Sequence, residues 1–402
     1  MPGLETSPLR LAIVNLLPAP YREPLYQRLS QTPGVRLRVY YLQSRDSLRR
    51  WADIRPSYDA LPLACHTPER LYPIPIVGLW NPGLIAELER FQPDCLIVHG
   101  YSYLPQMRAI RWAVSHRVPY LLWADSNQHQ LRGGWLELLK APLLRYFCRY
   151  AAGALTVGQS NEAFWSHYGL DGGRHFRSSL AVDNDFFRAQ ALRYRAHRPA
   201  ERAALGLPPG RLLLYAGRFA PQKNLALLLR VLAGRQRRGR PPLLLALVGD
   251  GPEKPGLQQV LRREGLRGVY LFGFQSQSEL ARFYCTADAL MLPSLVEPWG
   301  LVVNEAMACG LPVLVSRAAG CVADLLEEGG NGFSFDPRDP GSLDQCLERF
   351  SALDPAGLAA MGTCSAERIA GYSYDQTLEG LFQALESVRP GWRRPLPVSA
   401  AS

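Results

Sequence analysis

Paired cysteines are missing from this chain of 402 residues. Its eight cysteines are scattered, and none stands in the Cys-x-x-Cys spacing that zinc sites and dithiol redox centres use. Cys95, Cys285 and Cys309 stand in apolar contexts, which favours buried free thiols in a reducing cytoplasm. We therefore expect no structural zinc and a cytoplasmic location.

Long apolar segments are missing as well. No apolar run approaches the roughly 20 residues that a membrane-spanning helix needs, and residues 1–10 lack the apolar core of a signal peptide. The composition, 47% hydrophobic and 20% charged, is ordinary for a globular protein. A chain of this length has room for two domains with full cores.

Acidic residues are scarce in the first half only. Residues 1–200 hold 24 Lys/Arg and 15 Asp/Glu, a net charge of +9, whereas residues 201–402 hold 21 and 20, a net charge of +1. A basic half suggests an anionic partner, such as a phospholipid surface or a polyprenyl-phosphate-linked acceptor. The alternative is an arginine-rich composition that serves solubility. No nucleic acid partner is expected, because no recognition motif or aromatic platform accompanies the charge.

Apolar runs of strand length alternate with helical segments in both halves. In the first half, strands are expected near 10–17, 35–42, 94–98, 118–123, 154–157 and 177–182. In the second half, they are expected near 212–216, 243–248, 269–272, 289–292, 313–315 and 332–335. This alternation is typical of parallel sheets covered on both faces. The predicted fold class is α/β, with two doubly wound Rossmann-like domains that face a cleft.

An arginine- and proline-rich segment without a strand separates these two series. We place the first domain at 1–185, the linker at 186–210 and the second domain at 211–373. The remaining residues, 374–402, are predicted to form a last helix and a tail.

The segment from 291 to 315 carries the densest chemistry. Glu297, in a loop, and Glu305, in the second turn of the helix that follows, are eight residues apart. Gly300 lies between them, where the missing Cβ lets a ligand approach the backbone. The free N–H groups at the helix start, near Leu301 and Val302, suit a phosphate. A phosphate flanked by carboxylates that accept sugar hydroxyls describes a nucleotide-sugar site; the alternative is a buried helix with two solvated glutamates.

The residue identities in this segment are more informative than the spacing of its two glutamates. Glu-Pro-Trp-Gly-Leu-Val-Val-Asn-Glu-Ala-Met-Ala-Cys-Gly-Leu-Pro-Val, from 297 to 313, resembles the signature of retaining glycosyltransferases of family four, which have the GT-B fold. The resemblance implies that Glu305 holds the ribose and Glu297 the donor sugar. It also implies that a last helix, 374–388, crosses back to the first domain. The likeness is strong over about 155–375 and weaker over 10–155.

Two further segments of the second half resemble this family. Gly217-Arg218-Phe219-Ala220-Pro221-Gln222-Lys223-Asn224 is similar to a loop in which Arg218 and Lys223 would bind the donor diphosphate. Arginine and lysine side chains suit oxyanions, and a helix start follows. Phe274 stands where the family's backbone contacts the base. The glycines from 249 to 251 resemble a turn below the cleft and do not have dinucleotide-fingerprint spacing.

The first half departs from the family pattern. The family's first loop usually carries a Gly-Gly pair, whereas this chain has Pro18-Ala19-Pro20-Tyr21-Arg22, which resembles a branch acting on bacterial surface glycans. Arg22 is therefore an acceptor-side candidate. Asp125 occupies the position that most resembles the family's catalytic histidine, and would accept the acceptor proton or hold a sugar hydroxyl. A turn aspartate is the alternative. His129 and His99 are further acceptor-side candidates, with structural histidines as the alternative.

Three other features bear on metal binding, the cleft and the membrane. Asp183-Asn184-Asp185 has the form of a metal-binding Asp-x-Asp, but it enters the linker and resembles the family's Val-Asp-x-x-x-Phe turn, so no metal is expected. Gly320-Cys321 replaces the usual Gly-Gly, and this thiol is expected to narrow the cleft near the phosphates. The helix 135–150 carries aromatic and basic residues with an interrupting Pro142, which is consistent with a membrane-surface helix or with a core helix.

These features predict a retaining, metal-independent hexosyltransferase without a cofactor. Its donor would be a nucleotide-diphosphate sugar, and its acceptor a glycan or a lipid-linked glycan in bacterial polysaccharide or lipopolysaccharide synthesis. Peripheral contact with the inner face of the membrane is part of this hypothesis. The alternatives are a non-catalytic nucleotide-sugar-binding subunit and a nucleotide-sugar 2-epimerase on the same fold.

Overall fold

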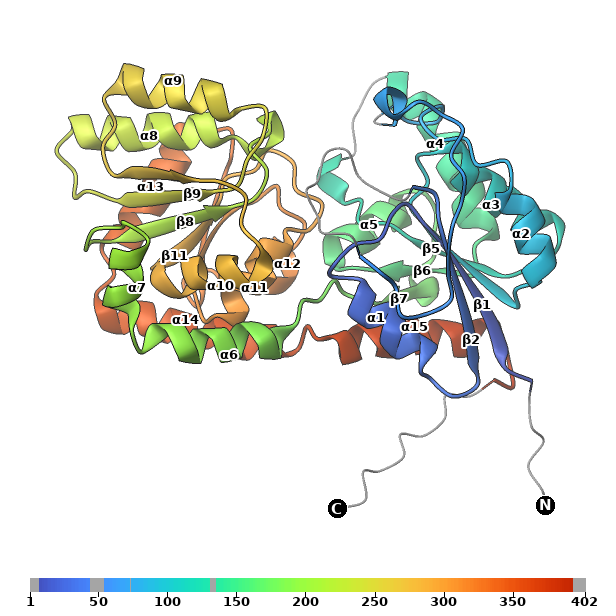
Figure 1. The fold of residues 1–402 in the computed structure, drawn as a ribbon. Coiled ribbons are helices and arrows are strands. Elements are labelled where there is room, and N and C mark those ends of the chain that lie inside the picture. The colour runs from blue at the N-terminus through green and yellow to red at the C-terminus, as the bar shows by residue number, and fades with distance from the viewer. Residues whose placement is uncertain (1–6, 44–53, 73, 131–134, 393–402) are drawn as a thin grey trace, which may run out of the picture.

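The computed structural model describes residues 7–43, 54–72, 74–130 and 135–392. Two sheets lie side by side, each with helices on both faces (Figure 1). The first has the strand order β3-β2-β1-β4-β5-β6-β7, and the second has the order β10-β9-β8-β11-β12-β13. Every registered strand pair is parallel. The predicted α/β class with two doubly wound units is confirmed.

The strands of the first sheet are β1 (Leu9–Asn15), β2 (Val35–Tyr41), β3 (Ala60–Pro62), β4 (Cys95–His99), β5 (Tyr120–Trp123), β6 (Gly153–Thr156) and β7 (His175–Arg177). Those of the second are β8 (Leu212–Ala216), β9 (Leu244–Val248), β10 (Val269–Phe272), β11 (Ala289–Leu292), β12 (Val313–Ser316) and β13 (Gly332–Phe335). The central strands are buried on both faces, which explains their unbroken apolar runs.

The α-helices of the first half are α1 (Glu23–Ser30), α2 (Leu84–Phe91), α3 (Leu104–Ser115), α4 (Trp135–Tyr150) and α5 (Gln159–His167). Those that follow are α6 (Asn184–Arg195), α7 (Arg198–Ala204), α8 (Leu225–Arg237), α9 (Lys254–Glu264), α10 (Gln277–Thr286), α11 (Leu301–Ala308), α12 (Val322–Leu325), α13 (Pro340–Ser351), α14 (Pro355–Ala370) and α15 (Tyr374–Val388). Four short 3₁₀ helices are η1 (Glu69–Leu71), η2 (Gln128–Gln130), η3 (Gly172–Arg174) and η4 (Pro221–Lys223).

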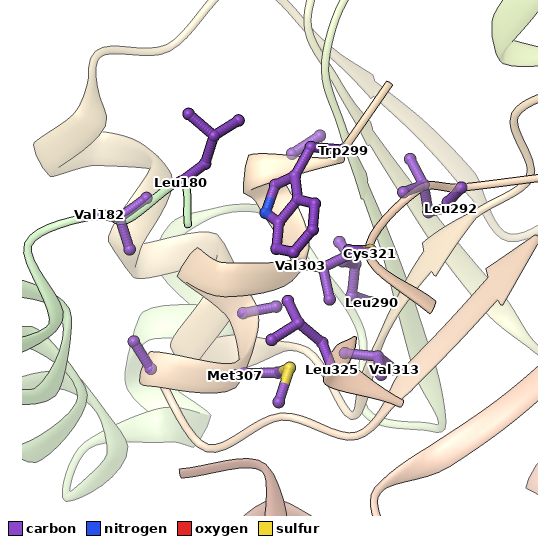
Figure 2. Packing of buried hydrophobic residues seen from close by; sticks show 14 of the residues in the cluster. Leu180, Val182, Leu290, Leu292, Trp299, Val303, Met307, Val313, Cys321 and Leu325 are labelled. Carbon is purple, nitrogen blue, oxygen red and sulfur yellow. The ribbon is translucent and has the colours of Figure 1, made fainter. Parts of the chain in front are cut away.

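The core of the second half is built around α11. Trp299, Val303 and Met307 pack against the buried ends of β11 and β12 (Figure 2). Leu180 and Val182, which come from the first half, join the same cluster. Burying each large apolar side chain contributes about 1.5–3 kcal/mol, so the apolar packing that fixes α11 also ties the two halves together.

The predicted strand at 177–182 is wrong beyond its first residue. β7 ends at Arg177. Ser178 N still donates to Thr156 O of β6 at 2.8 Å, but the other polar groups of this segment bond to helices. Ser178 Oγ donates to Thr377 O at 2.9 Å, Thr377 Oγ1 donates to Ser179 O at 2.6 Å and Asn304 Nδ2 donates to Leu180 O at 3.1 Å. The chain stays extended here because it passes from one half to the other between α15 and α11.

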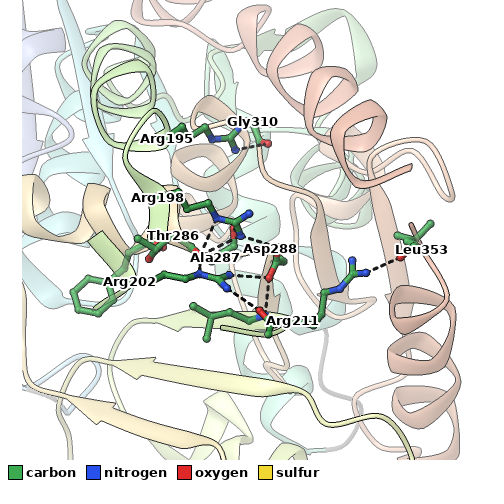
Figure 3. Close-up of polar contacts among 12 residues, drawn as sticks. Arg195, Arg198, Arg202, Arg211, Thr286, Ala287, Asp288, Gly310 and Leu353 are labelled. Carbon is green, nitrogen blue, oxygen red and sulfur yellow. Dashed lines mark hydrogen bonds and ion pairs between the residues drawn. The ribbon is translucent and has the colours of Figure 1, made fainter. Parts of the chain in front are cut away.

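The predicted linker, 186–210, is largely helical. α6 and α7 pack on α10; the arginines of α7 bind the end of α10, and Arg195 of α6 donates to Gly310 O after α11 (Figure 3). Arg202 Nε donates to Thr286 O at 2.8 Å, while Arg198 and Arg202 form ion pairs with Asp288 at 2.6 and 2.9 Å. Burial opposes ionisation of Asp288, but these two cations and the Leu212 N–H outweigh it and lower its pKa. Arginine richness here has a structural cause. The domain boundaries drawn from the sequence stay a prediction.

The last helix, α15, lies against the first sheet (Figure 1). Gly380 is required at this contact, because a Cβ there would come within 1.7 Å of Arg177 O. Asp375 pairs with Arg28 of α1 at 2.6 Å, which fixes the start of the helix on the first half. The predicted tail beyond 392 lies outside the described residues.

The helix α4 runs without a break through Pro142. Leu144, Phe147 and Cys148 are buried in the core of the first half, whereas Leu138 is exposed. One face of α4 is therefore a core face. No helix among the described residues has the length and apolar character needed to span a membrane.

Candidate functional site

The loop that precedes α11 has a backbone shape that only glycine adopts easily. Gly300 caps the helix with φ of +105°, and a Cβ there would meet Leu292 Cδ2 at 3.0 Å and Glu297 Cγ at 3.3 Å. The loop is held on one side by two N–H donors, from Gly320 to Glu297 O at 3.0 Å and from Cys321 to Trp299 O at 3.3 Å. No side chain of the described residues caps α11, so the N–H groups of its first turn remain directed at the space in front of Gly300.

The structure brings Glu297 and Lys223 together. Lys223 Nζ forms an ion pair with Glu297 Oε2, and Ser294 Oγ donates to the same oxygen at 3.2 Å. The two loops are also joined through their backbones, since Leu295 N donates to Gln222 O at 2.8 Å. The sequence-based hypothesis gave these residues separate ligands, diphosphate for Lys223 and sugar for Glu297. Without a ligand, each is the partner of the other.

Arg218 lies on the loop after β8, and its side chain is exposed. The backbone of the loop is fixed: Tyr215 Oη donates to Arg218 O at 2.9 Å, and Phe219 N donates to Asp250 O at 2.8 Å. A Cβ at Gly249 would come within 1.9 Å of Gly217 O, so the glycine turn after β9 supports this loop directly. Within the described residues the Arg218 guanidinium has no ion pair, so it is available to an anion.

Glu305 faces a different environment. It is partly buried in the second turn of α11, and Tyr284 Oη donates to its Oε2 at 2.6 Å. Burial raises the pKa of Glu305 to about 7, against the opposing effect of the Tyr284 hydrogen bond. In the part of the chain that the structure describes, no cation pairs with this carboxyl. Glu305 therefore has acceptor capacity left for ligand hydroxyls.

Phe274 follows β10 and is 49% exposed. Arg218 follows β8 and Glu297 follows β11, so all three residues lie after strands of one parallel sheet. The carboxyl ends of parallel strands share an edge, where α/β folds bind ligands. Leu301 and Val302, also predicted to contact the donor, form the half-buried first turn of α11 at this edge.

In the first half, three predicted residues converge after β1, β4 and β5. Arg22 Nη2 lies 3.4 Å from Asp125 Oδ1, and His99 Nε2 lies 3.9 Å from the same oxygen. The Arg22 guanidinium also stacks on Trp123, at 4.6 Å from the ring centroid. Asp125 is thus placed between a cation and an imidazole, on the partly exposed rim of the group.

These placements change what the two basic residues do. Arg22 is only 2% exposed, so it lies beneath Asp125 instead of at the surface as the acceptor-side hypothesis implied. Burial, reinforced by the Arg22 charge, holds the pKa of His99 well below its ordinary value, so His99 is neutral at pH 7. His129 lies apart at the surface in η2, and partial burial lowers its pKa.

Two other sequence hypotheses gain a structural context. Cys321 was expected to narrow the cleft, but its thiol is buried with the α11 core residues (Figure 2). Asp183 caps α6 by accepting from Phe186 N at 2.9 Å, and Asp185 pairs with Arg188 at 3.5 Å on the surface. Among the described residues, no group of three acidic, cysteine or histidine side chains is arranged to hold a metal ion.

Sequence reasoning missed the residues that join the halves at this site. Asn127 Nδ2 donates to Glu297 O at 2.8 Å and to Pro298 O at 3.0 Å. Asp324 accepts from Gln159 N at 3.0 Å and from Arg177 at 2.8 Å. The only sequence signals were the position of Asn127, two residues after Asp125, and that of Asp324, the acidic residue after Gly320-Cys321. Neither signal indicates the partner, which lies more than 140 positions away in each case.

Comparison with known proteins agrees with this geometry. Residues 197–358 match the family model described as glycosyl transferases group 1. The chain is 27% identical over 291 residues to the sulfoquinovosyl transferase SQD2 of Arabidopsis thaliana, which covers 70% of this chain and 53% of that protein. It is 36% identical over 222 residues to D-inositol 3-phosphate glycosyltransferase 2 of Catenulispora acidiphila, which covers 52% of this chain and 50% of that protein. The chain thus spans about half the length of these curated relatives.

The fold is shared over nearly the whole chain. HepE of Anabaena, solved in complex with UDP, matches with a TM-score of 0.72 at 17% sequence identity, covering 94% of this chain and 100% of that one. HepE has also been solved with UDP-glucose. At this identity the likeness shows the fold, and the family match lies in the half that carries Arg218, Glu297 and Glu305. The segment 197–358 therefore belongs to the glycosyl transferases group 1 family, and the chain has the GT-B fold.

Proposed function

We propose that this protein is a retaining glycosyltransferase that moves a hexosyl group from a nucleotide-diphosphate sugar to a glycan or a lipid-linked acceptor. The observation that carries the proposal is the arrangement after β8 and β11. An exposed Arg218, an uncapped α11 and the carboxyl of Glu305 without a cation lie at one sheet edge. Cations and a helix start suit a diphosphate, and a carboxylate suits ribose hydroxyls.

The chemistry follows from these placements. As the bond between the sugar C1 and the diphosphate breaks, negative charge grows on the leaving phosphate. Arg218, Lys223 and the first turn of α11 stabilise that charge, and one preorganised donor of this kind contributes ~2.7–4 kcal/mol. The acceptor oxygen attacks C1 from the face that the phosphate leaves, so configuration is retained. The acceptor proton passes either to the leaving phosphate or to Asp125, and the Asp125→Asn substitution distinguishes these two routes.

The remaining carboxylates hold the reacting sugar. Glu297 contacts the donor sugar once a ligand draws Lys223 toward the phosphates, which would release the Lys223–Glu297 ion pair. Asp125 faces the acceptor, where it accepts a hydroxyl proton or fixes a sugar hydroxyl. No metal and no cofactor take part in this scheme, because Arg218 and Lys223 supply the charge on the diphosphate. Activity should therefore survive EDTA; loss of turnover on chelation, restored by manganese, would overturn this part.

The acceptor side supports a membrane-bound partner. Ile76, Val77 and Trp80 are exposed beside the loop after β4, since Ile76 N donates to Ser102 O at 2.7 Å. They belong to the half with a net charge of +9. We place the protein in the cytoplasm, at the inner face of the membrane, in bacterial polysaccharide or lipopolysaccharide synthesis. An anionic lipid surface is the partner that fits this half.

Two experiments test the proposal. A thermal-shift panel of nucleoside diphosphates should identify the base, because a ligand that binds only the folded state stabilises it by mass action. Radiolabelled donor is then incubated with membrane extract. Transfer of label to lipid or glycan is the expected result, whereas binding without transfer would indicate a nucleotide-sugar-binding subunit. Conversion of the free donor into its 2-epimer would indicate an epimerase.

A further inference from the structure

One buried amide of the first half holds the loop of the second half that carries Glu297. Asn127, between β5 and η2, is 1% exposed. Its Nδ2 donates to two consecutive carbonyl oxygens, Glu297 O at 2.8 Å and Pro298 O at 3.0 Å. The fit is close, because a Cβ at Gly320 would come within 2.9 Å of Nδ2. This contact leaves no room for a larger group on either side.

The orientation of the amide follows from its partners. Both contacted atoms are carbonyl oxygens, which accept only, so the NH₂ group must face them. The other atom, Oδ1, is buried and has no hydrogen-bond partner among the described residues. A buried acceptor without a partner is unfavourable, so the two hydrogen bonds from Nδ2 must offset that cost where the halves meet.

The Asp125 loop is anchored on its other side by a second amide. Asn161 Nδ2 donates to Ala124 O at 2.8 Å and to Ser126 O at 2.5 Å, so the backbone on both sides of Asp125 is held by α5. Asn127 follows directly and reaches Glu297. Two amides in series thus connect the backbone around Asp125 with the backbone of Glu297, across the boundary between the halves.

We propose that Asn127 is a positioning residue that aligns Asp125 with Glu297 when the two halves come together. The inference rests on the proposed function, because it assigns the acceptor side to Asp125 and the donor sugar to Glu297. Asn127 itself contacts neither substrate. Its contribution is to turnover, whereas nucleotide binding depends on Arg218, Lys223 and Glu305, which all lie in the second half.

The chain offers a matched control. Gln159 Nε2 donates to Ala323 O at 3.0 Å, which is also an amide-to-carbonyl contact across the halves, but it is exposed. It lies at the start of α5, and its side chain reaches Ala323 O instead of the carbonyl groups of Glu297 and Pro298. Gln159→Ala removes a contact between the halves without touching the backbone beside Asp125 or Glu297.

The test compares Asn127→Ala, Asn127→Asp and Gln159→Ala. Asn127→Ala should lower kcat about 10-fold or more, the worth of two lost hydrogen bonds, with the Kd of nucleoside diphosphate, measured by calorimetry, within about twofold of wild type. Gln159→Ala should keep kcat within about twofold. Asn127→Asp places a carboxylate against two carbonyls, so its kcat should be lower still. The kcat of Asn127→Asp should recover as pH falls, because the protonated acid becomes a hydrogen-bond donor. Lost packing alone does not produce such a pH profile.

Three results would overturn the inference. These are an unchanged kcat in Asn127→Ala, an equal loss in Gln159→Ala, and a nucleotide Kd that weakens in step with kcat. If the wild-type chain transfers no sugar, the proposed function fails, and the Asn127 contact between the halves is tested alone by small-angle scattering with nucleoside diphosphate bound. A larger radius of gyration for Asn127→Asp than for wild type and Gln159→Ala supports a role of this contact in holding the halves together. Equal radii overturn it.

Discussion

The two halves share an architecture but build their polar sites in opposite ways. In the second half, the groups come from short segments: Arg218 and Lys223 are five residues apart, and Glu297 and Glu305 are eight apart. In the first half, Arg22, His99 and Asp125 follow three different strands and meet only in the folded sheet. A site whose residues lie in short segments can be predicted from the sequence, whereas a site assembled from distant loops cannot.

The halves also differ in how their charges are satisfied. Arg218 and Glu305 keep their capacity for a ligand, since neither has an oppositely charged partner among the described residues. In the first half, the buried Arg22 and the neutral His99 both turn toward Asp125. The second half is therefore prepared to receive charge, whereas the first half concentrates its electrostatics on one carboxylate. Substitutions in the two halves should therefore change different kinetic parameters.

The largest effect should come from Asp125→Asn. The change keeps the shape of the side chain and removes its basicity, and general acid–base groups contribute typically about 10²- to 10⁴-fold. A loss of kcat in this range is expected, with little change in nucleotide affinity. Steady-state kinetics with calorimetry measures both. Asp171→Asn, the same change at an exposed aspartate that caps η3, is the control and should retain activity. A kcat of Asp125→Asn near that of wild type would remove the first half from the chemistry.

The next effect concerns the anion clamp of the second half. A hydrogen bond to a charged group is worth ~1.5–3 kcal/mol, about 10- to 150-fold in binding. Arg218→Ala and Lys223→Ala should weaken nucleoside diphosphate by this factor and leave the free nucleoside almost unaffected. Calorimetry with both ligands is the measurement. Arg237→Ala, which removes an exposed cation paired with Glu264 on the far side of the unit, should change neither Kd.

Lys223→Ala carries an additional expectation. It leaves Glu297 largely buried without its cation, and an unpaired buried charge is destabilising. The Tm of Lys223→Ala should fall, whereas that of Arg218→Ala, whose side chain is exposed, should stay near wild type. Equal weakening of diphosphate and nucleoside by either variant would show that the cation does not meet the phosphates.

How far the sequence leads follows the same division between the halves. The alternation of strands and helices predicted both sheets, because buried parallel strands are nearly continuous apolar runs. It failed at 178–182, where an extended chain satisfies its backbone with Thr377 and Asn304 instead of a strand. It also missed β3 and α12, which are three and four residues long, too short for a period to show.

The candidate site was predictable only where one segment contains the chemistry. Glu297 and Glu305 could be picked out because they lie in one short segment. The Lys223–Glu297 ion pair joins positions 74 apart, and local spacing carries no information about it. Arg22 was predicted only as an acceptor-side residue, and nothing in the sequence indicated its burial, since arginine is seldom buried. Its burial depends on Trp123 and Asp125, which approach it only through the order of the strands. Long-range pairing of this kind is a property of topology.

A smaller effect should separate the two glutamates. In the proposed function, Glu305 contacts a ribose that does not change during the reaction, so Glu305→Gln should raise the donor KM, by about 10-fold for one weakened charged hydrogen bond, at nearly constant kcat. The same proposal puts Glu297 beside the reacting carbon, so Glu297→Gln should chiefly lower kcat. Steady-state kinetics distinguishes the two, with circular dichroism as the folding control. The reverse pattern would mean that the donor lies the other way round in the cleft.

Glu305 should also give the second half a pH dependence. Its pKa is raised to about 7 by burial, while an unfolded glutamate titrates near ~4.3. Between these values the folded state binds more protons, so this group's contribution to stability falls as pH rises from about 4.3 to 7. The donor KM should fall over the upper part of this window, because the ionised carboxylate is the better acceptor. Both trends should disappear in Glu305→Gln; a wild-type Tm and KM that follow the variant across this window would exclude Glu305 as their source.

The smallest effect should distinguish the surface beside the loop after β4 from the surface of α6. Val77 is 62% exposed beside that loop, and Leu192 is 75% exposed on α6, beyond the first sheet. Val77→Asp should reduce co-sedimentation with phosphatidylglycerol vesicles about fivefold, since one charge near an anionic surface is worth ~1 kcal/mol. Leu192→Asp adds the same charge and removes a similar side chain, so it should leave binding unchanged. Equal losses in both variants would mean that net charge alone governs association. Unchanged binding of Val77→Asp would remove the segment around Ile76 and Trp80 from the membrane contact.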